Sequence, residues 1–225
     1  MTDTGAGTTL IVCVDAAKLL FPDYVKDPGK NDRSVTAAAQ RIADSVLLNV
    51  LAPPPLPDRE IVLICVGSPG SGKTAMLRAP SDLAVDFKVE ETFDDLERAR
   101  GLIRQIIQSG RKPVVLWLYV DDIGKTVERM FRRSLKIGRT DRLEYMAEAY
   151  VAVPKVLERL SAEFSDCLKI HLVNNSGAKG EMEFEQDSNR IWTPYEDAIA
   201  TAVGMIQVDS TNRMFRENPD FEVDY

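Results

Sequence analysis

Eight consecutive residues, 67–74, have the types and spacing of a phosphate-binding loop. They fit the pattern G-x-x-x-x-G-K-[ST]. Glycines let successive backbone N–H groups turn inward around phosphate oxygens, while the lysine reaches the β- and γ-phosphates and the hydroxyl binds Mg²⁺. The nucleotide-binding residues predicted from this pattern are Gly67, Ser68, Pro69, Gly70, Ser71, Gly72, Lys73 and Thr74. Lys73 is also predicted to be catalytic, and Thr74 to be the metal ligand. A glycine-rich turn with a surface lysine is the alternative interpretation.

The sequence on both sides of this loop supports nucleotide binding. Residues 61–66 are apolar and mostly β-branched, which predicts a buried parallel strand. Residues 75–78 can open a helix, whose N-terminus adds partial positive charge beside the phosphates. Strand, loop and helix in this order are the structural context that the motif requires.

Two carboxylate sites follow predicted strands elsewhere in the chain. Asp15 ends the β-branched run 8–14, and Asp121 and Asp122 end the most apolar run, 113–120. Open α/β sheets bind ligands beyond the carboxyl ends of their strands, so both sites are candidates for an active site.

A dense basic cluster lies in residues 125–142 of an otherwise acidic chain. A helix predicted after Asp122 carries Lys125, Arg129, Arg132, Arg133 and Lys136, and Arg139 and Arg142 follow. A solvated helix face is one interpretation. Arginines beside a phosphate loop also commonly stabilise the charge of phosphoryl transfer, and we favour that interpretation.

Length and composition limit the remaining choices. A chain of 225 residues predicts one α/β domain or one domain with a small appendage. The formal net charge of −7 makes a nucleic-acid partner a poor expectation. Cys13, Cys65 and Cys167 lack metal-ligand spacing, and no leader or membrane-spanning run is evident, so we expect a cytoplasmic protein that contacts no membrane.

The periodicity of apolar residues predicts a P-loop NTPase three-layer α/β fold, with a mostly parallel central sheet flanked by helices. Strands are expected at 8–14, 61–66, 83–89, 113–120 and 169–173. Helices are expected after Ser34, after Thr92, after Asp122, over 143–150 and from Pro154. The proline-rich residues 52–57 predict a stiff connector. Residues 1–177 form the predicted domain, with 125–150 as a lid segment. Residues 178–225 form a C-terminal extension with a helix at 198–205 and a loose tail.

The phosphate loop, the arginine-rich helix, the Gly138-Arg139 step and the later strand ending in Asn174-Asn175-Ser176 resemble the zeta-toxin-like small-molecule kinases. In that family an aspartate ends the strand after the phosphate-loop helix, often followed by Lys and Pro-x-Tyr. Here the corresponding residues, Asp15, Lys18 and Pro22-Asp23-Tyr24, precede the loop. The chain therefore looks circularly permuted relative to the family. The alternative is an added N-terminal strand and helix in which Asp15 only caps the helix.

The resemblance implies roles for several residues. Asp15 would be the general base, and Arg133 and Arg139 would stabilise the charge on the transferring group. Arg129 and Arg132 are alternatives to Arg133 in that role. Glu90 or Glu91 with Thr92 would correspond to an acidic position that contacts substrate. The implied cofactors are ATP or GTP and Mg²⁺, and the implied acceptor is a hydroxyl of a small molecule, for example a nucleotide sugar. The resemblance allows a protein partner such as an antitoxin, but no sequence feature indicates one.

A different function class stays open. A nucleotide-hydrolysing switch or accessory subunit would need a strand-end carboxylate beside the loop, and Asp121 or Asp122 could serve. The arginine-rich lid favours the kinase, because a kinase must shield its phosphoryl group from water.

Overall fold

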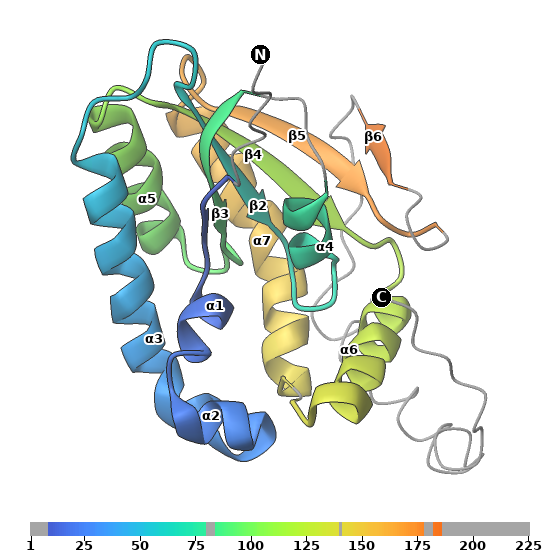
Figure 1. Ribbon diagram of the computed structural model, residues 1–225. Coiled ribbons are helices and arrows are strands. Elements are labelled where there is room, and N and C mark those ends of the chain that lie inside the picture. The colour runs from blue at the N-terminus through green and yellow to red at the C-terminus, as the bar shows by residue number, and fades with distance from the viewer. Residues whose placement is uncertain (1–8, 80–83, 140, 178–181, 186–225) are drawn as a thin grey trace, which may run out of the picture.

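A six-stranded sheet forms the centre of the molecule (Figure 1). The computed structural model describes residues 9–79, 84–139, 141–177 and 182–185. The strand order is β1-β3-β2-β4-β5-β6, and every pair is parallel except the antiparallel pair β5 and β6. The strands are β1 (Ile11–Val12), β2 (Ile61–Val66), β3 (Val85–Glu90), β4 (Lys112–Tyr119), β5 (Lys169–Asn174) and β6 (Glu183–Glu185).

Helices cover the sheet in separate layers. They are α1 (Val14–Lys18), α2 (Pro22–Lys26), α3 (Pro28–Leu51), α4 (Lys73–Arg78), α5 (Leu96–Gln108), α6 (Ile123–Ile137) and α7 (Leu143–Glu163). The main core joins one face of the sheet to α3, α5 and α7, through residues such as Leu47, Ile103 and Leu160. On the other face, Leu77 of α4 packs against Cys65 and Leu118. The predicted three-layer α/β class with a mostly parallel sheet is therefore confirmed.

The helix α6 stands apart from this core. Its apolar side packs against the first half of α7 in a separate cluster that includes Val127, Met130 and Met146. Asp122 caps α6 as predicted, since its carboxylate accepts from the N–H of Gly124. In Figure 1, α6 lies beyond the carboxyl ends of the strands, on the same edge of the sheet as α1 and α2.

The N-terminal elements begin and end at different residues from those predicted. Only two residues of the expected strand 8–14 pair with β3, because α1 starts at Val14. Pro22 begins α2 at its first turn, a position at which proline costs no hydrogen bond. The cap of α3 is Asp27, whose carboxylate accepts from the N–H of Lys30, and not the predicted Ser34, which lies inside the helix.

Two further capping predictions were wrong. Asp95, not Thr92, caps α5 by accepting from the N–H of Arg98. Pro154 does not begin a helix but lies within the single long helix α7. The apolar residues before and after Pro154 pack against the core, and this burial offsets the missing hydrogen bond.

A buried arginine fastens the end of α3 to the sheet, next to the proline-rich connector. Arg111 pairs with Asp86 at 2.6 Å and donates to the carbonyls of Leu51 and Val50. Its guanidinium also lies over the ring of Phe87. These contacts hold the N-terminal elements in place against the strands that follow the connector.

The predicted helix 198–205 lies outside the described residues. Of the segment 178–225, the described part is residues 182–185, and its strand β6 joins the sheet beside β5. Among the helices of the described residues, none is long and apolar enough to cross a membrane.

Candidate active site

The loop between β2 and α4 has a positive φ at three glycines, and the space for a side chain is smallest at Gly67 and Gly72. Gly67 has φ +147°, and a Cβ atom there would lie 2.2 Å from the carbonyl oxygen of Leu118. Gly72, with φ +99°, would place a Cβ atom 2.3 Å from the side-chain amide nitrogen of Asn175. Both contacts are far too close for any side chain, so the close packing of this loop depends on its glycines.

Lys73 begins α4 and is almost fully buried. Its amine donates to the carbonyls of Gly67 at 2.7 Å and Ser68 at 3.1 Å. Burial lowers the pKa of Lys73, while the carboxylates of Glu90 and Asp15 act in the opposite direction. The lysine therefore lies in the field of two carboxylates, one from the end of β3 and one from α1.

The hydroxyl of Thr74 contacts the carboxylate of Glu90, which the sequence did not predict as a metal ligand. Its oxygen lies 3.1 and 3.2 Å from the two carboxylate oxygens of Glu90, at the end of β3. Burial raises the pKa of Glu90, and Lys73 counteracts this. A hydroxyl and a carboxylate are both hard oxygen ligands, which is the chemistry that Mg²⁺ prefers.

The small number of carboxylates beside the loop also fits Mg²⁺. Among the described residues, no three His, Cys, Asp or Glu side chains group as a metal cage. Mg²⁺ does not need one, since it is commonly held by one or two carboxylates together with waters and phosphate oxygens. Thr74 and Glu90, directly beside the phosphate loop, are compatible with that mode of binding.

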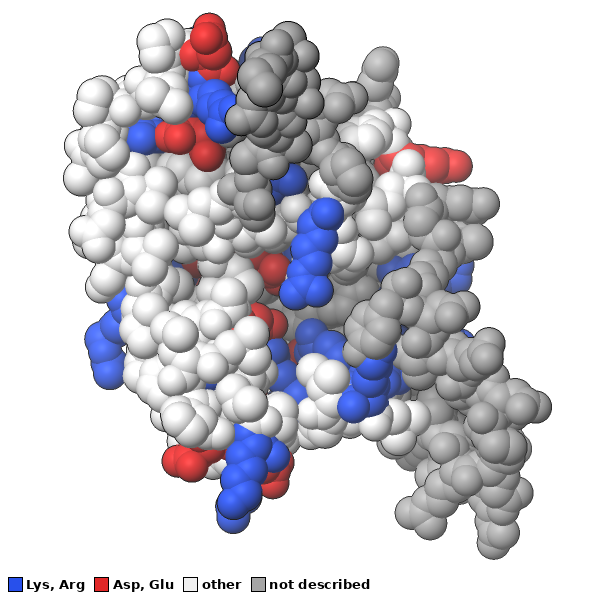
Figure 2. Space-filling model, in the orientation of Figure 1, with Lys and Arg blue, Asp and Glu red and all other residues white. Residues whose placement is uncertain are grey.

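A cavity of about 1180 Å³ opens beside the phosphate loop. In the space-filling view of Figure 2, acidic and basic side chains gather in a hollow in the middle of this face. Its lining comes from the loop, from α1 and α3, from the segment after β3 and from α6 and the start of α7. Besides the loop, the charged or polar residues that line it include Asp15, Asp32, Thr36, Gln40, Arg129, Arg133, Arg139, Asp141 and Tyr145.

Asp15 lies on the wall of this cavity that β1 and α1 supply. It does not cap α1, because the sulfur of Cys13 accepts the capping hydrogen bond from Ala16. Burial alone would raise the pKa of Asp15, but the Arg139 guanidinium, with Lys18 and Arg133, more than offsets this, and the pKa is lowered. The interpretation of Asp15 as a helix cap is therefore wrong.

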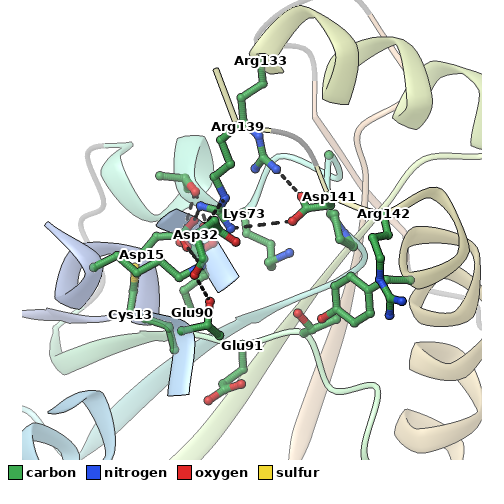
Figure 3. A pocket seen from close by; sticks show the side chains of 18 of the residues that line it. Cys13, Asp15, Asp32, Lys73, Glu90, Glu91, Arg133, Arg139, Asp141 and Arg142 are labelled. Atoms are coloured by element: carbon green, nitrogen blue, oxygen red, sulfur yellow. Dashed lines mark hydrogen bonds and ion pairs between the residues drawn. The ribbon is translucent and has the colours of Figure 1, made fainter. Parts of the chain in front are cut away.

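Arg139 and Arg133, the two arginines favoured from the sequence, both lie in the cavity wall in ion pairs (Figure 3). Arg139 contacts Asp15 at 2.7 Å and Asp32 at 3.0 Å, and also approaches Asp141. Arg133 pairs with Asp141. The close-up shows these side chains converging from α1, α3 and the end of α6, with Lys73 and Glu90 nearby.

The two competing arginines are placed differently from each other. Arg132 pairs with Glu128 on the exposed side of α6 and does not line the cavity. Arg129 does line it, and donates through one guanidinium nitrogen to the carbonyl of Asn175 at 2.9 Å. Geometry thus separates Arg129 from Arg132, which spacing alone could not do.

The strand-end carboxylates proposed for the hydrolase are not in the cavity. Asp121 accepts hydrogen bonds from the side chains of Asn174 and Ser176, and Asp122 caps α6. Neither lines the cavity, so Glu90 is the strand-end carboxylate beside the loop. A signal for Glu90 was present in the sequence, since it follows an expected strand, but nothing in the sequence says that this strand is the neighbour of β2.

Comparisons with known proteins add little to this geometry. No protein-family model matches the chain, and no curated protein matches it. One solved structure with a similar fold is described as the crystal structure of AvrRxo1-ORF1:AvrRxo1-ORF2 with sulphate ions. It is 12% identical, with a TM-score of 0.42, and the match covers 61% of this chain and 60% of that one. A likeness this distant does not bear on activity.

Proposed function

We propose that the protein is an ATP- or GTP-dependent phosphotransferase that moves a γ-phosphoryl group to a hydroxyl of a small molecule. One observation carries the proposal. Asp15 and the phosphate loop lie on opposite sides of the connector in the sequence, yet they line a single large cavity. The loop provides a place for the nucleotide, and the volume beyond it provides a place for an acceptor beside a carboxylate.

The loop and its neighbours would hold the nucleotide. The backbone of residues 67–74 and the Lys73 amine would surround the β- and γ-phosphates. Thr74, together with Glu90, would hold Mg²⁺, which supplies neutralising charge to the phosphates when bound. Lys73 is buried and Glu90 is partly buried, so their interactions with phosphate and cation are stronger than at a fully exposed site.

Asp15 would orient the acceptor hydroxyl and receive its proton. Its lowered pKa keeps the carboxylate ionised at neutral pH, so that it can accept a hydrogen bond from the hydroxyl. A weak base is sufficient, because most analyses of phosphoryl transfer find a loose transition state in which positioning and charge matter most. Arg133 and Arg139 would stabilise charge on the transferring group after exchanging a carboxylate partner for phosphate oxygen.

The position of β1 supports a circular permutation and the relationship to the zeta-toxin-like kinases. β1 precedes the connector in sequence but pairs in parallel with β3, so its carboxyl end lies at the same edge of the sheet as the phosphate loop. A parallel sheet tolerates such a rearrangement, because strand adjacency in space holds it together. A nucleotide sugar remains one acceptor that this relationship would suggest.

A nucleotide-hydrolysing protein is the second candidate, and the Thr74–Glu90 contact is equally compatible with it. A strand-end carboxylate beside the loop can hold Mg²⁺ and orient water as well as it can serve a kinase. The two functions differ in whether the γ-phosphate reaches an organic acceptor or water, and in whether the rate depends on Asp15.

The test follows labelled γ-phosphate from ATP and from GTP in a pool of small hydroxyl-bearing metabolites. Asp15→Asn is expected to keep the nucleotide Kd within about threefold and to slow transfer to an organic product by about 100-fold or more. Lys73→Ala is expected to lose nucleotide binding. Asp23→Asn, an exposed carboxylate of α2 outside the cavity, is the matched control and should transfer normally.

Two outcomes would overturn the kinase proposal. Label that reaches only inorganic phosphate, at a rate unchanged in Asp15→Asn, would identify a hydrolase. Loss of nucleotide binding in Asp15→Asn would show that Asp15 belongs to the nucleotide site and not to an acceptor site.

A further inference from the structure

The first half of α6 is docked directly onto the phosphate loop and the turn after β5. A Cβ atom on Gly70 would lie 2.8 Å from the carbonyl oxygen of Thr126, so the loop and α6 are in close contact. The Lys125 amine donates to the carbonyl of Ser176 at 2.7 Å, and the Arg129 guanidinium to that of Asn175 at 2.9 Å. This end of the predicted lid is therefore fixed against the site.

Asn175, in the turn after β5, contacts both the phosphate loop and α6. The side-chain amide of Asn175 donates to the carbonyl of Ser71, within the phosphate loop, at 2.8 Å. The same side chain occupies the space that a Cβ atom on Gly72 would need. Asn175 is 7% exposed, and its own backbone carbonyl accepts from Arg129. Asn175 thus links the loop on one side to an arginine of α6 on the other.

Arg129, which lines the cavity, has one guanidinium nitrogen without a hydrogen-bond partner among the described residues. Its Nη2 is bonded to Asn175, but its Nη1 is buried and has no hydrogen-bond partner among the described residues. A buried guanidinium N–H without an acceptor is costly, and an anion is the ligand that satisfies it. Within the described part of the chain, Arg133 and Arg139 also have a buried Nε without a hydrogen bond, but unlike Arg129 each pairs with a carboxylate in the cavity.

We propose that Asn175 is a positioning residue that sets Arg129 against the γ-phosphate end of the nucleotide. Its side chain fixes the turn to the loop, and its backbone carbonyl holds one side of the guanidinium. The free Nη1 then faces an oxygen of the terminal phosphoryl group. The inference rests on the proposed nucleotide site, but not on transfer to a hydroxyl.

The experiment measures binding of ADP, and of ADP with beryllium fluoride as a mimic of the γ-phosphoryl group, both with Mg²⁺. The wild type is expected to bind the mimic complex more tightly than ADP. Asn175→Ala and Arg129→Ala should each reduce that preference by about tenfold or more, with the Kd of ADP changed less than about threefold. Because one residue acts through the other, the double variant should lose no more than Arg129→Ala alone.

Lys125→Ala is the matched control, since Lys125 bonds to the neighbouring carbonyl of the same turn but does not line the cavity. It should keep the full preference for the mimic. If Asn175→Ala weakens ADP and the mimic equally, or if the losses of the two single variants multiply in the double variant, Asn175 only fastens the turn and the proposal is wrong. Should Asn175→Ala fail to fold, Asn175→Ser replaces it in the same cycle.

The outcomes separate this inference from the proposed function. A wild type that prefers the mimic but transfers no phosphate to any acceptor would exclude the kinase and leave the Asn175–Arg129 link standing. If phosphate transfer is normal in the wild type and Arg129→Ala still prefers the mimic complex over ADP as the wild type does, the kinase proposal stands and the Asn175–Arg129 inference is wrong.

Discussion

Three carboxylates and three cations form one ion-pair network around Asp15. Asp15, Asp32 and Asp141 alternate with Lys18, Arg133 and Arg139, and together they come from α1, α3, α6 and the segment between α6 and α7. The network is balanced in formal charge, which explains how so many ionised groups share one partly buried wall. It also fixes the Asp15 carboxylate relative to the arginines.

The network predicts a pH-dependent contribution of Asp15 to stability. The folded pKa of Asp15 lies below its usual value of 3.8, so the stabilisation is fully present above about pH 4 and is lost as the pH falls through the folded pKa. Asp15→Asn should lower the free energy of unfolding at pH 7 by about 0.5–1 kcal/mol, a modest amount because the side chain is 41% exposed. Urea unfolding at pH 7, 5 and 3 measures it.

The difference between Asp15→Asn and wild type should shrink toward pH 3, while Asp23→Asn should differ little from wild type throughout. A difference that stays constant with pH would mean that the substitution acts through packing and not through charge.

A site residue could be predicted from the sequence when the other residues of its motif are close to it in the chain. The phosphate loop was readable because its glycines, Lys73 and Thr74 are adjacent in the chain. Asp15 was a candidate because it follows a predicted strand, and its role as a base came from analogy with a family pattern; the structure puts it in the same cavity as the loop. Glu90 was named only together with Glu91, as a position that contacts substrate, and Asp32 and Asn175 were given no role. Their partners are distant in sequence, and their contacts depend on which elements are neighbours in space.

At the scale of single elements, the phosphate loop contrasts with an unconstrained helix glycine. Gly67 has a positive φ and a backbone carbonyl where a side chain would go, whereas a Cβ on Gly101, within α5, would meet nothing within 4 Å. Gly67→Ala should destabilise the protein by about 2 kcal/mol or more and abolish nucleotide binding. Gly101→Ala should stabilise it by about 0.5–1 kcal/mol.

Thermal unfolding and nucleotide titration of both variants check this pair of expectations. Equal effects of the two substitutions, in either direction, would show that the loop conformation is not under steric control.

The element predictions failed mainly at boundaries. Asp27 and Ser34 are both good capping residues, and the choice between them is made by Pro28, which fits the first turn of a helix. Pro154 is a helix breaker by local rules, yet α7 continues through it because the flanking residues are buried. Element type and order were readable from apolar periodicity, whereas termini depended on tertiary packing.

At the scale of the whole molecule, Arg111 ties the elements on the two sides of the connector together. Its side chain is 2% exposed and pairs with Asp86 while holding the last carbonyls of α3. Arg111→Ala leaves these groups without their partner and should cost about 3 kcal/mol of stability. The adjacent Lys112, which pairs with Glu60 but is 71% exposed, is the control, and Lys112→Ala should cost about 0.5 kcal/mol or less.

Chemical denaturation of both variants measures these free energies. If Arg111→Ala unfolds at nearly the wild-type denaturant concentration, the connector and apolar packing alone hold the N-terminal elements in place.

The cavity has two walls of separate origin in the chain. Residues before the connector supply Asp15, Asp32 and the inner side of α3, while residues after it supply the phosphate loop, Glu90 and the arginines. The wall carrying Asp15 joins the sheet through a strand of only two residues. If the proposed function holds, substitutions along α3 would reshape the acceptor side of the cavity without changing the residues that bind the nucleotide. Related proteins could then differ in acceptor specificity while keeping the same nucleotide site.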